Sequence, residues 1–213
     1  MQSYLGSPYP VLGLSTPQMR TVMNANQSQF VQIGVKDLNV LSELLWAGHT
    51  FEEKVAAIIV FGRCAEHLDA ESWSIMNRWI DQAVGWALCD SLGSGPISSV
   101  LHRNPKRFSE VLKWTRSANK WRRRISAYAM NDFVRMGELE RPYALLEKLL
   151  YDEEFWVQRA VGTWLRECWK KDRAKTETFL LEHVKGLPRV VITVATERAP
   201  EDFREELRRK REN

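Results

Sequence analysis

Long apolar runs and closely spaced cysteine pairs are both missing from this sequence of 213 residues. Charged residues make up 27% of the chain, and no apolar stretch approaches the roughly 18 residues that a membrane-spanning helix needs. The opening residues carry neither the basic segment nor the apolar segment of a secretory signal. We therefore expect a soluble, cytoplasmic protein.

Cysteine and histidine are scarce. The cysteines Cys64, Cys89 and Cys168 are odd in number and too far apart for a Cys-x-x-Cys clip, and the four histidines show no ligand spacing. We expect no disulfide framework, no metal site and no cofactor. Core material is plentiful, however, because 44% of the residues are hydrophobic and nine are tryptophan. We expect a single domain over residues 1–213.

Negative charge is nearly absent from one stretch of the chain. Residues 101–124 hold nine Lys or Arg against the single acid Glu110, a local charge of +8 in a chain that carries +4 in all. Concentrated positive charge is typical of a polyanion-binding surface, because each neutralised phosphate releases counterions. A solvated helix face would give the same pattern. Charge by itself therefore suggests nucleic acid without establishing it.

Strand patterns are missing as well, since no stretch alternates apolar and polar residues between turn dipeptides. Apolar residues recur instead at helical spacing, as at Val55, Ile58 and Ile59. Helix starts are predicted at Ser15-Thr-Pro17, a cap followed by proline, and at Thr50-Phe-Glu-Glu53, a capping box. We predict an all-α protein with about ten or eleven helices of roughly 10–17 residues.

A spacing of 35 residues relates several of these helices. Aromatic residues recur at that interval at Phe51, Trp86, Trp121 and Trp156. A second series follows three positions later, at Lys54, Cys89, Arg124 and Arg159. A period of this length with two helices is typical of an α-solenoid of HEAT-like helix pairs, whose residues in register line one concave face. We expect Lys54, Arg124 and Arg159 to face a common groove. Packing between repeats is the alternative role for each tryptophan.

Four blocks of sequence, in order over residues 4–167, resemble one known family. The first block is Tyr4 with Val11-Leu-Gly-Leu-Ser-Thr-Pro17, which is similar to a Phe-Leu-Gly-hydrophobic-x-Thr-Pro run near the start of the family's sequences. The other three blocks are Trp86-Ala-Leu-Cys-Asp90, Ser117-Ala-Asn-Lys-Trp-Arg-Arg-Arg124, and Phe155-Trp-Val-Gln-Arg-Ala-Val-Gly162 followed by Leu165-Arg-Glu167. Together they resemble the bacterial DNA alkylation repair enzymes, the AlkD-type DNA glycosylases with HEAT-like repeats. The resemblance implies an α-solenoid whose concave surface binds duplex DNA.

The resemblance also implies roles for individual residues. Trp86 and Asp90 match the active-site tryptophan and the catalytic aspartate of the family. Arg124 matches an arginine that contacts the DNA backbone beside the lesion, and Arg166 is expected near DNA. We extend the expectation of DNA contact to their neighbours in these blocks, which are Tyr4, Lys120, Trp121, Arg123 and Arg159. Asp90 as a mere N-cap of the next helix is the alternative for that residue.

The sequence departs from the family pattern at Thr163, where the family has a second active-site tryptophan directly after a glycine. Here Trp164 comes one position later, about 100° further around a helix, so it should not face the same way. Without this second tryptophan, the active site would have one aromatic side chain fewer, which could change both its activity and its range of substrates.

The implied chemistry is hydrolysis of an N-glycosidic bond in base excision repair. Alkylation at N3 of adenine or N7 of guanine makes the base cationic and a better leaving group. Trp86 could hold a cation by cation–π attraction, worth about 0.5–2 kcal/mol, and Asp90 could stabilise the oxocarbenium-like sugar. No lysine in these blocks is an obvious Schiff-base nucleophile, so strand cleavage is not expected.

Two functions of different classes are consistent with the sequence. The first is a monomeric glycosylase that removes 3-methyladenine and 7-methylguanine from duplex DNA. The second is a non-catalytic HEAT-like-repeat protein that recognises DNA structure. Thr163 favours the second function, whereas the Trp86–Asp90 pair favours the first.

Overall fold

The computed structural model describes residues 2–212, and every regular element within that range is helical. This confirms the predicted all-α class. The chain divides into two compact units, Met1–Ser109 and Glu110–Asn213, and each unit is described by itself. None of the described helices combines the length and the apolar character that a membrane crossing requires.

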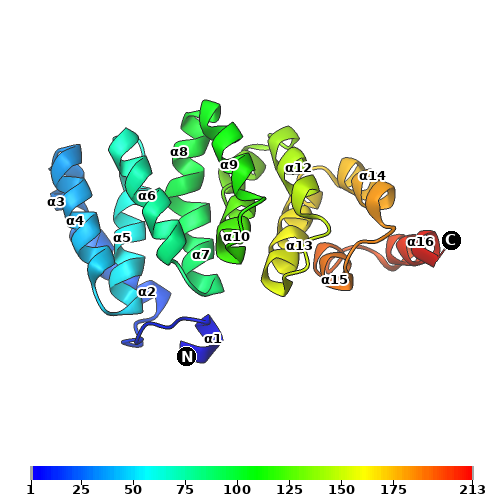
Figure 1. The fold of residues 1–213 in the computed structure, drawn as a ribbon, viewed down its shortest axis with the longest axis horizontal. Helices are drawn as coiled ribbons and strands as arrows, with labels where there is room; N and C mark the ends of the chain where they lie inside the picture. The colour runs from blue at the N-terminus through cyan, green and yellow to red at the C-terminus, as the bar shows by residue number, and fades with distance from the viewer. Residues whose placement is uncertain (1, 213) are drawn as a thin grey trace. The chain divides into compact units, whose positions relative to one another are not determined.

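The first unit contains α1 to α8, with a π-helical turn and a 3-10 turn near its end. Their bounds are α1 (Gln2–Leu5), α2 (Thr16–Ala25), α3 (Gln27–Gln32), α4 (Val35–Ala47), α5 (Phe51–Arg63), α6 (Ala70–Gln82), α7 (Trp86–Leu92), η1 (Gly93–Ile97), α8 (Ser98–Arg103) and η2 (Pro105–Arg107). Figure 1 shows α4, α5 and α6 as neighbouring helices. Helix α9 (Phe108–Trp114) crosses the boundary between the units.

The second unit continues from α9 to the C-terminal helix. Its elements are α10 (Lys120–Tyr128), α11 (Asn131–Met136), α12 (Glu140–Leu146), η3 (Glu147–Leu149), α13 (Phe155–Trp169), α14 (Arg173–His183), α15 (Arg189–Ala195) and α16 (Glu201–Glu212). The described range thus holds more and shorter helices than the predicted ten or eleven. The additional breaks, such as Asn26 and Ala129-Met130, carry no proline or glycine that would reveal them in the sequence.

Capping side chains explain several helix starts. The predicted cap at Ser15 is confirmed and forms a capping box with Gln18 at α2, and the predicted capping box of Thr50 with Glu53 is confirmed at α5. Asp69 caps α6 by accepting a hydrogen bond from the Ser72 amide, and this bond lowers the pKa of the Asp69 carboxyl. These caps satisfy amides that the helices themselves leave without partners.

The 35-residue spacing has a clear structural meaning. Phe51 and Trp86 are the first residues of α5 and α7, and Trp121 and Trp156 are the second residues of α10 and α13. The spacing therefore marks the first turn of four helices. Lys54, three positions after Phe51, is buried and donates hydrogen bonds to the carbonyls of Trp46 and Gly48 at the end of α4.

Aromatic stacking builds the core of the first unit. The ring of Trp79 is stacked between Trp46, at 4.6 Å, and Phe61, at 4.9 Å between ring centroids. These three side chains come from α4, α5 and α6 and are all buried. Their packing joins the three helices that precede α7.

Close packing of α13 against α15 organises the second unit, and the two helices lie side by side in Figure 1. Gly162 makes this approach possible. A Cβ at that position would lie 2.7 Å from the Val194 Cβ and 2.9 Å from the Val191 carbonyl oxygen. Because both of these atoms are firmly placed in α15, no side chain larger than glycine fits there without movement of a helix.

Gly162→Ala is expected to lower the free energy of unfolding by about 1–3 kcal/mol, because the added methyl group overpacks the α13–α15 contact. Urea unfolding followed by circular dichroism measures this loss. Gly62→Ala is the matched control, because Gly62 also lies inside a helix and a Cβ there would meet its nearest neighbour, Pro96, at an ordinary 3.8 Å. Equal effects of the two substitutions would contradict the close-packing explanation.

Candidate functional site

Trp86 and Tyr4 form an aromatic corner in the first unit. The Trp86 indole Nε1–H donates a hydrogen bond to the Tyr4 carbonyl oxygen at 2.7 Å. The two rings lie edge to face, with centroids 5.5 Å apart and planes at 86°. Tyr4 is 73% exposed, and Trp86 is half-buried. Because the indole N–H is already engaged, a ligand can meet Trp86 only through its ring.

Asp90 lies one helical turn after Trp86 on α7 and is half-buried. Residues at this spacing share one face of a helix. The alternative role for Asp90 as an N-cap is wrong, because Asp90 lies inside α7, which continues to Leu92. The first unit thus presents a carboxylate beside an aromatic ring, the pair that the family resemblance singles out.

Arg124 is buried in the second unit, with only 4% of its surface exposed. Its Nη1 donates to the Trp156 carbonyl, and its Nη2 donates to the Tyr128 hydroxyl at 3.2 Å. The guanidinium also lies over the rings of Tyr128, at 5.0 Å, and Trp156, at 5.8 Å. These contacts hold Arg124 in one orientation between α10 and the start of α13.

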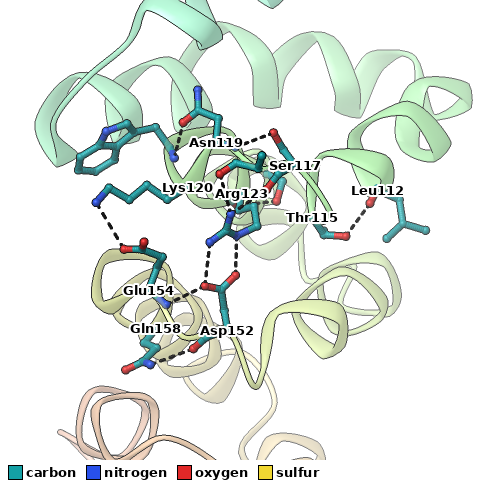
Figure 2. Close-up of polar contacts among 12 residues, drawn as sticks. Leu112, Thr115, Ser117, Asn119, Lys120, Arg123, Asp152, Glu154 and Gln158 are labelled. Atoms are coloured by element: carbon teal, nitrogen blue, oxygen red, sulfur yellow. Dashed lines mark hydrogen bonds and ion pairs between the residues drawn. The ribbon is translucent and has the colours of Figure 1, made fainter.

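The side chain of Arg123 is bound to other groups of the protein. Its Nε donates to Asp152 Oδ2 at 2.6 Å, its Nη2 donates to Asp152 Oδ1 at 3.2 Å, and its Nη1 donates to the Ser117 carbonyl at 2.7 Å (Figure 2). The side chains of Arg123 and Asp152 are only 15% and 9% exposed. Asp152 also accepts a hydrogen bond from the Glu154 amide at 2.9 Å. The pair therefore joins the loop before α10 to the loop before α13, which gives Arg123 a structural task.

Lys120, Trp121 and Arg159 are more accessible than the two central arginines. Lys120 makes an exposed ion pair with Glu154 at 3.4 Å (Figure 2). The ring of Trp121 lies 6.2 Å from that of Trp156. Arg159 is exposed, and its guanidinium lies 5.8 Å from the centre of the Phe155 ring. These side chains present cationic and aromatic groups at the first turns of α10 and α13.

Arg166 differs from them because two carboxylates hold it. Its Nη1 pairs with Glu197, and its Nε lies 3.5 Å from Glu167 Oε1. The basic residues predicted to contact DNA thus fall into two groups. Protein groups hold Arg123, Arg124 and Arg166 in shielded positions, whereas Arg159 and Lys120, the latter in its partly exposed pair with Glu154, reach the surface.

A metal-dependent site finds no support in the part of the chain that the structure describes. Within residues 2–212, no group of three or more His, Cys, Asp or Glu side chains is arranged to hold a metal ion. The three cysteines are all buried, and burial raises the pKa of the Cys64 thiol and raises that of Cys168 to about 12. Such thiols are poor nucleophiles at neutral pH.

Comparison with known proteins identifies the family. A family model described as DNA alkylation repair enzyme matches residues 1–199. The chain belongs to the DNA alkylation repair enzyme family. No curated protein matches the sequence significantly.

Solved structures of similar proteins share the fold. A structure described as a predicted DNA alkylation repair enzyme from Enterococcus faecalis matches with a TM-score of 0.81 and 16% identity, covering 94% of this chain and 93% of that one. The structure of smu.31 from Streptococcus mutans matches at 0.68 with 15% identity, covering 85% and 91%. AlkD2 from Streptococcus mutans matches at 0.62 with 16% identity, covering 84% and 98%. The helical solenoid fold of this family is therefore also the fold of this chain.

The surroundings of Thr163 and Trp164 show whether Trp164 can face the same way as Thr163. Trp164 is 5% exposed, and its ring packs edge-on against Tyr128 at 5.5 Å. It is thus a core residue, and the half-buried Thr163 points elsewhere on α13. Trp164 therefore does not share the direction of Thr163, as the 100° step between neighbouring helical positions predicts.

Several residues that matter for these positions gave no signal in the sequence. Asp152, Tyr128 and Glu52 are ordinary polar residues in the pattern, and their importance comes from partners 29, 4 and about 40 positions away. Only the aromatic spacing pointed to Trp156. The pairings of Asp152 and Glu52 join segments far apart in the chain, which a single sequence does not reveal.

Asp152→Asn is expected to lower the free energy of unfolding by about 2 kcal/mol or more, because it leaves the shielded Arg123 guanidinium without its counter-charge. Glu154→Gln removes a carboxylate from the neighbouring but exposed pair with Lys120 and should cost less than about 1 kcal/mol. Chemical denaturation of both variants tests the difference. If both variants lose less than about 1 kcal/mol of unfolding free energy, the Arg123–Asp152 pair stabilises the protein no more than an exposed ion pair does.

Proposed function

We propose that this protein is a monofunctional DNA glycosylase that removes cationic N3- or N7-alkylated purines from duplex DNA. The observation that carries the proposal is the Trp86–Asp90 pair, one turn apart on α7, with the edge of Tyr4 beside the indole. Membership in the DNA alkylation repair enzyme family supports it. In this proposal the protein acts as a cytoplasmic monomer, without metal or cofactor, in base excision repair.

Each of the two residues has a distinct chemical task in the proposed reaction. The face of the Trp86 ring holds positive charge on the alkylated base or on the sugar by cation–π attraction. The Asp90 carboxylate stabilises the oxocarbenium-like sugar as the N-glycosidic bond breaks, and it orients the water that attacks C1′. The purine leaves with the bonding electron pair, which neutralises the charge of the alkylated ring. A proton from the attacking water is released when the new C1′–O bond forms.

Residues of the second unit supply binding to the DNA backbone in this proposal. Lys120 and Arg159 reach the surface near the starts of α10 and α13, and the half-buried Trp121 follows Lys120. Arg124, which is buried, orients the start of α13 toward the backbone through its contacts with Trp156 and Tyr128. Arg123 and Arg166 contribute mainly by holding these segments in place. Each phosphate contact adds to the salt dependence of binding.

A non-catalytic protein that recognises DNA structure is the second candidate. The observation that favours it is Thr163, because Trp164 is buried in the core and the second aromatic wall is absent. Both candidates bind duplex DNA, so an excision measurement is needed to separate them.

Asp90→Asn is expected to lower the single-turnover rate of base release by about 10²–10³-fold, because the amide cannot balance the developing positive charge. The substrate is duplex DNA that carries 7-methylguanine, and the affinity for this duplex should stay within a few-fold of wild type. Glu71→Gln, which neutralises an exposed acid in the first turn of α6, is the control. Wild-type release no faster than the spontaneous rate, with binding intact, would favour the non-catalytic function.

Thr163→Trp introduces the second active-site tryptophan that the family resemblance implies, and on that basis we expect it to raise the rate of base release by about 2–30-fold, the factor that corresponds to one cation–π contact. Thr163→Leu is the matched control, because it adds apolar volume without an aromatic face. The comparison uses the same 7-methylguanine duplex under single-turnover conditions. An equal effect of Trp and Leu would show that position 163 contributes volume only.

A further inference from the structure

Glu52 is a buried carboxylate whose partners are backbone amides. It is 4% exposed, in the first turn of α5. Its Oε1 accepts hydrogen bonds from the amides of Gly13, at 2.9 Å, and Leu14, at 3.3 Å, and its Oε2 accepts one from Leu12 at 3.0 Å. It forms no ion pair with any other described residue. Three successive amides thus satisfy a charge that would otherwise be costly to bury.

The segment that Glu52 holds leads back to Trp86. The Phe51 amide donates to the Pro10 carbonyl at 2.9 Å, and the Tyr9 hydroxyl donates to the Gln82 carbonyl at 3.0 Å. These bonds fix the middle of the segment against α5 and against the end of α6. Residues 2–14 are therefore attached at intervals along the first unit.

A close approach of two glycines anchors the far end of this segment. Gly6 lies so near Gly85 that a Cβ on Gly85 would overlap the Gly6 carbonyl oxygen. Gly85 has φ +91°, a conformation that side chains disfavour, and it directly precedes Trp86. Beyond Gly6, the Tyr4 carbonyl accepts the hydrogen bond from the Trp86 indole at 2.7 Å.

We propose that Glu52 is a positioning residue for Trp86, acting through residues 2–14. By holding the amides of residues 12–14, Glu52 keeps the Tyr4 carbonyl against the indole Nε1–H and so fixes the ring plane of Trp86. The proposal rests on the proposed function, because it assigns the fixed ring to the binding of a cationic substrate. The neighbouring Glu53 has a different task, since its carboxylate caps α5 through Thr50.

Glu52→Gln weakens this attachment for a geometric reason. The carboxylate uses both oxygens as acceptors, whereas glutamine offers one oxygen and one NH₂ group. In either orientation the NH₂ group faces a backbone N–H, so at least one bond is replaced by a contact between two donors. Glu53→Gln is the matched control, because it removes the same charge one position later and glutamine also serves in a capping box.

The indole N–H signals in a nitrogen-15 NMR spectrum report on Trp86 without any need for activity. The signal of Trp86 is assigned by its loss in Trp86→Phe. In Glu52→Gln we expect its hydrogen exchange to become at least about tenfold faster, the factor that loss of one hydrogen bond to a charged group carries. The Trp169 signal, whose indole donates to Glu177 at 3.1 Å, should exchange as in wild type. In Glu53→Gln the Trp86 signal should keep its wild-type exchange rate.

A second variant tests the same contact if Glu52→Gln does not fold. Gly13 has φ +92°, and a Cβ there meets no atom within 4 Å, so Gly13→Ala strains the loop without a clash. It should also accelerate exchange of the Trp86 indole N–H. Wild-type protection of Trp86 in every folded variant would overturn the proposal, whatever the activity.

The activity measurement separates this proposal from the proposed function. If wild type releases 7-methylguanine, Glu52→Gln should lower the single-turnover rate about tenfold, with duplex affinity within a few-fold of wild type. If Glu52→Gln releases the base at the wild-type rate although its indole exchanges faster, the orientation of Trp86 by Glu52 does not affect base release, and that part of the proposal is overturned. An inactive wild type would refute the glycosylase and leave the exchange result to decide the positioning role.

Discussion

Burial of charge is the constraint on which both units depend. A charged side chain removed from water must be given partners, and in this protein backbone groups supply many of them. Glu52 binds three amides, Lys54 binds two carbonyls, and Arg124 binds the Trp156 carbonyl. Each of these residues lies in or near the first turn of its helix; Glu52 and Arg124 bind segments distant in sequence, and Lys54 binds the end of the preceding helix. Because the buried charges need these hydrogen bonds, they hold in place the loops that carry the candidate site.

This constraint separates two kinds of basic residue that composition cannot distinguish. Residues 101–124 appear in the sequence as one zone of +8 charge. In the structure, Arg123 pairs with Asp152 and Arg124 is held by Trp156 and Tyr128, whereas the side chain of Lys120 is 40% exposed in its pair with Glu154. Part of the zone thus stabilises the second unit, and the rest is accessible to a polyanion.

Much of the fold could be predicted from the sequence, because helix starts are local. The capping boxes at Ser15 and Thr50 and the aromatic spacing from Phe51 to Trp156 involve residues close in sequence or regular in period. The helix breaks at Asn26 and Ala129 escaped prediction because no glycine or proline marks them. The family was also predictable, since its four blocks keep their order.

The roles of site residues were harder to predict, because they depend on partners far along the chain. The orientation of Trp164 follows from a 100° step on a helix and was predictable. The difference between Arg123 and Arg124 depends on Asp152 and Trp156, which only the fold brings near. The single HEAT-like-repeat domain over residues 1–213 and the DNA contacts of the individual residues remain predictions.

The hydrogen bond from Trp86 to Tyr4 limits how the site could select a substrate. A free indole N–H could recognise an acceptor atom on a base, but this one is already bound to a carbonyl. Recognition through the ring face favours positive charge over base identity, and one such contact is worth only about 0.5–2 kcal/mol. That energy corresponds to about 2–30-fold in rate, far less than the selectivity that repair of rare lesions requires. In the proposed reaction, most of the discrimination then comes from the lesion itself, because a cationic alkylpurine is already a good leaving group and a normal base is not. A site with one tryptophan and one carboxylate is consistent with a reaction of this kind, in which the protein stabilises charge that the damage has made easy to form.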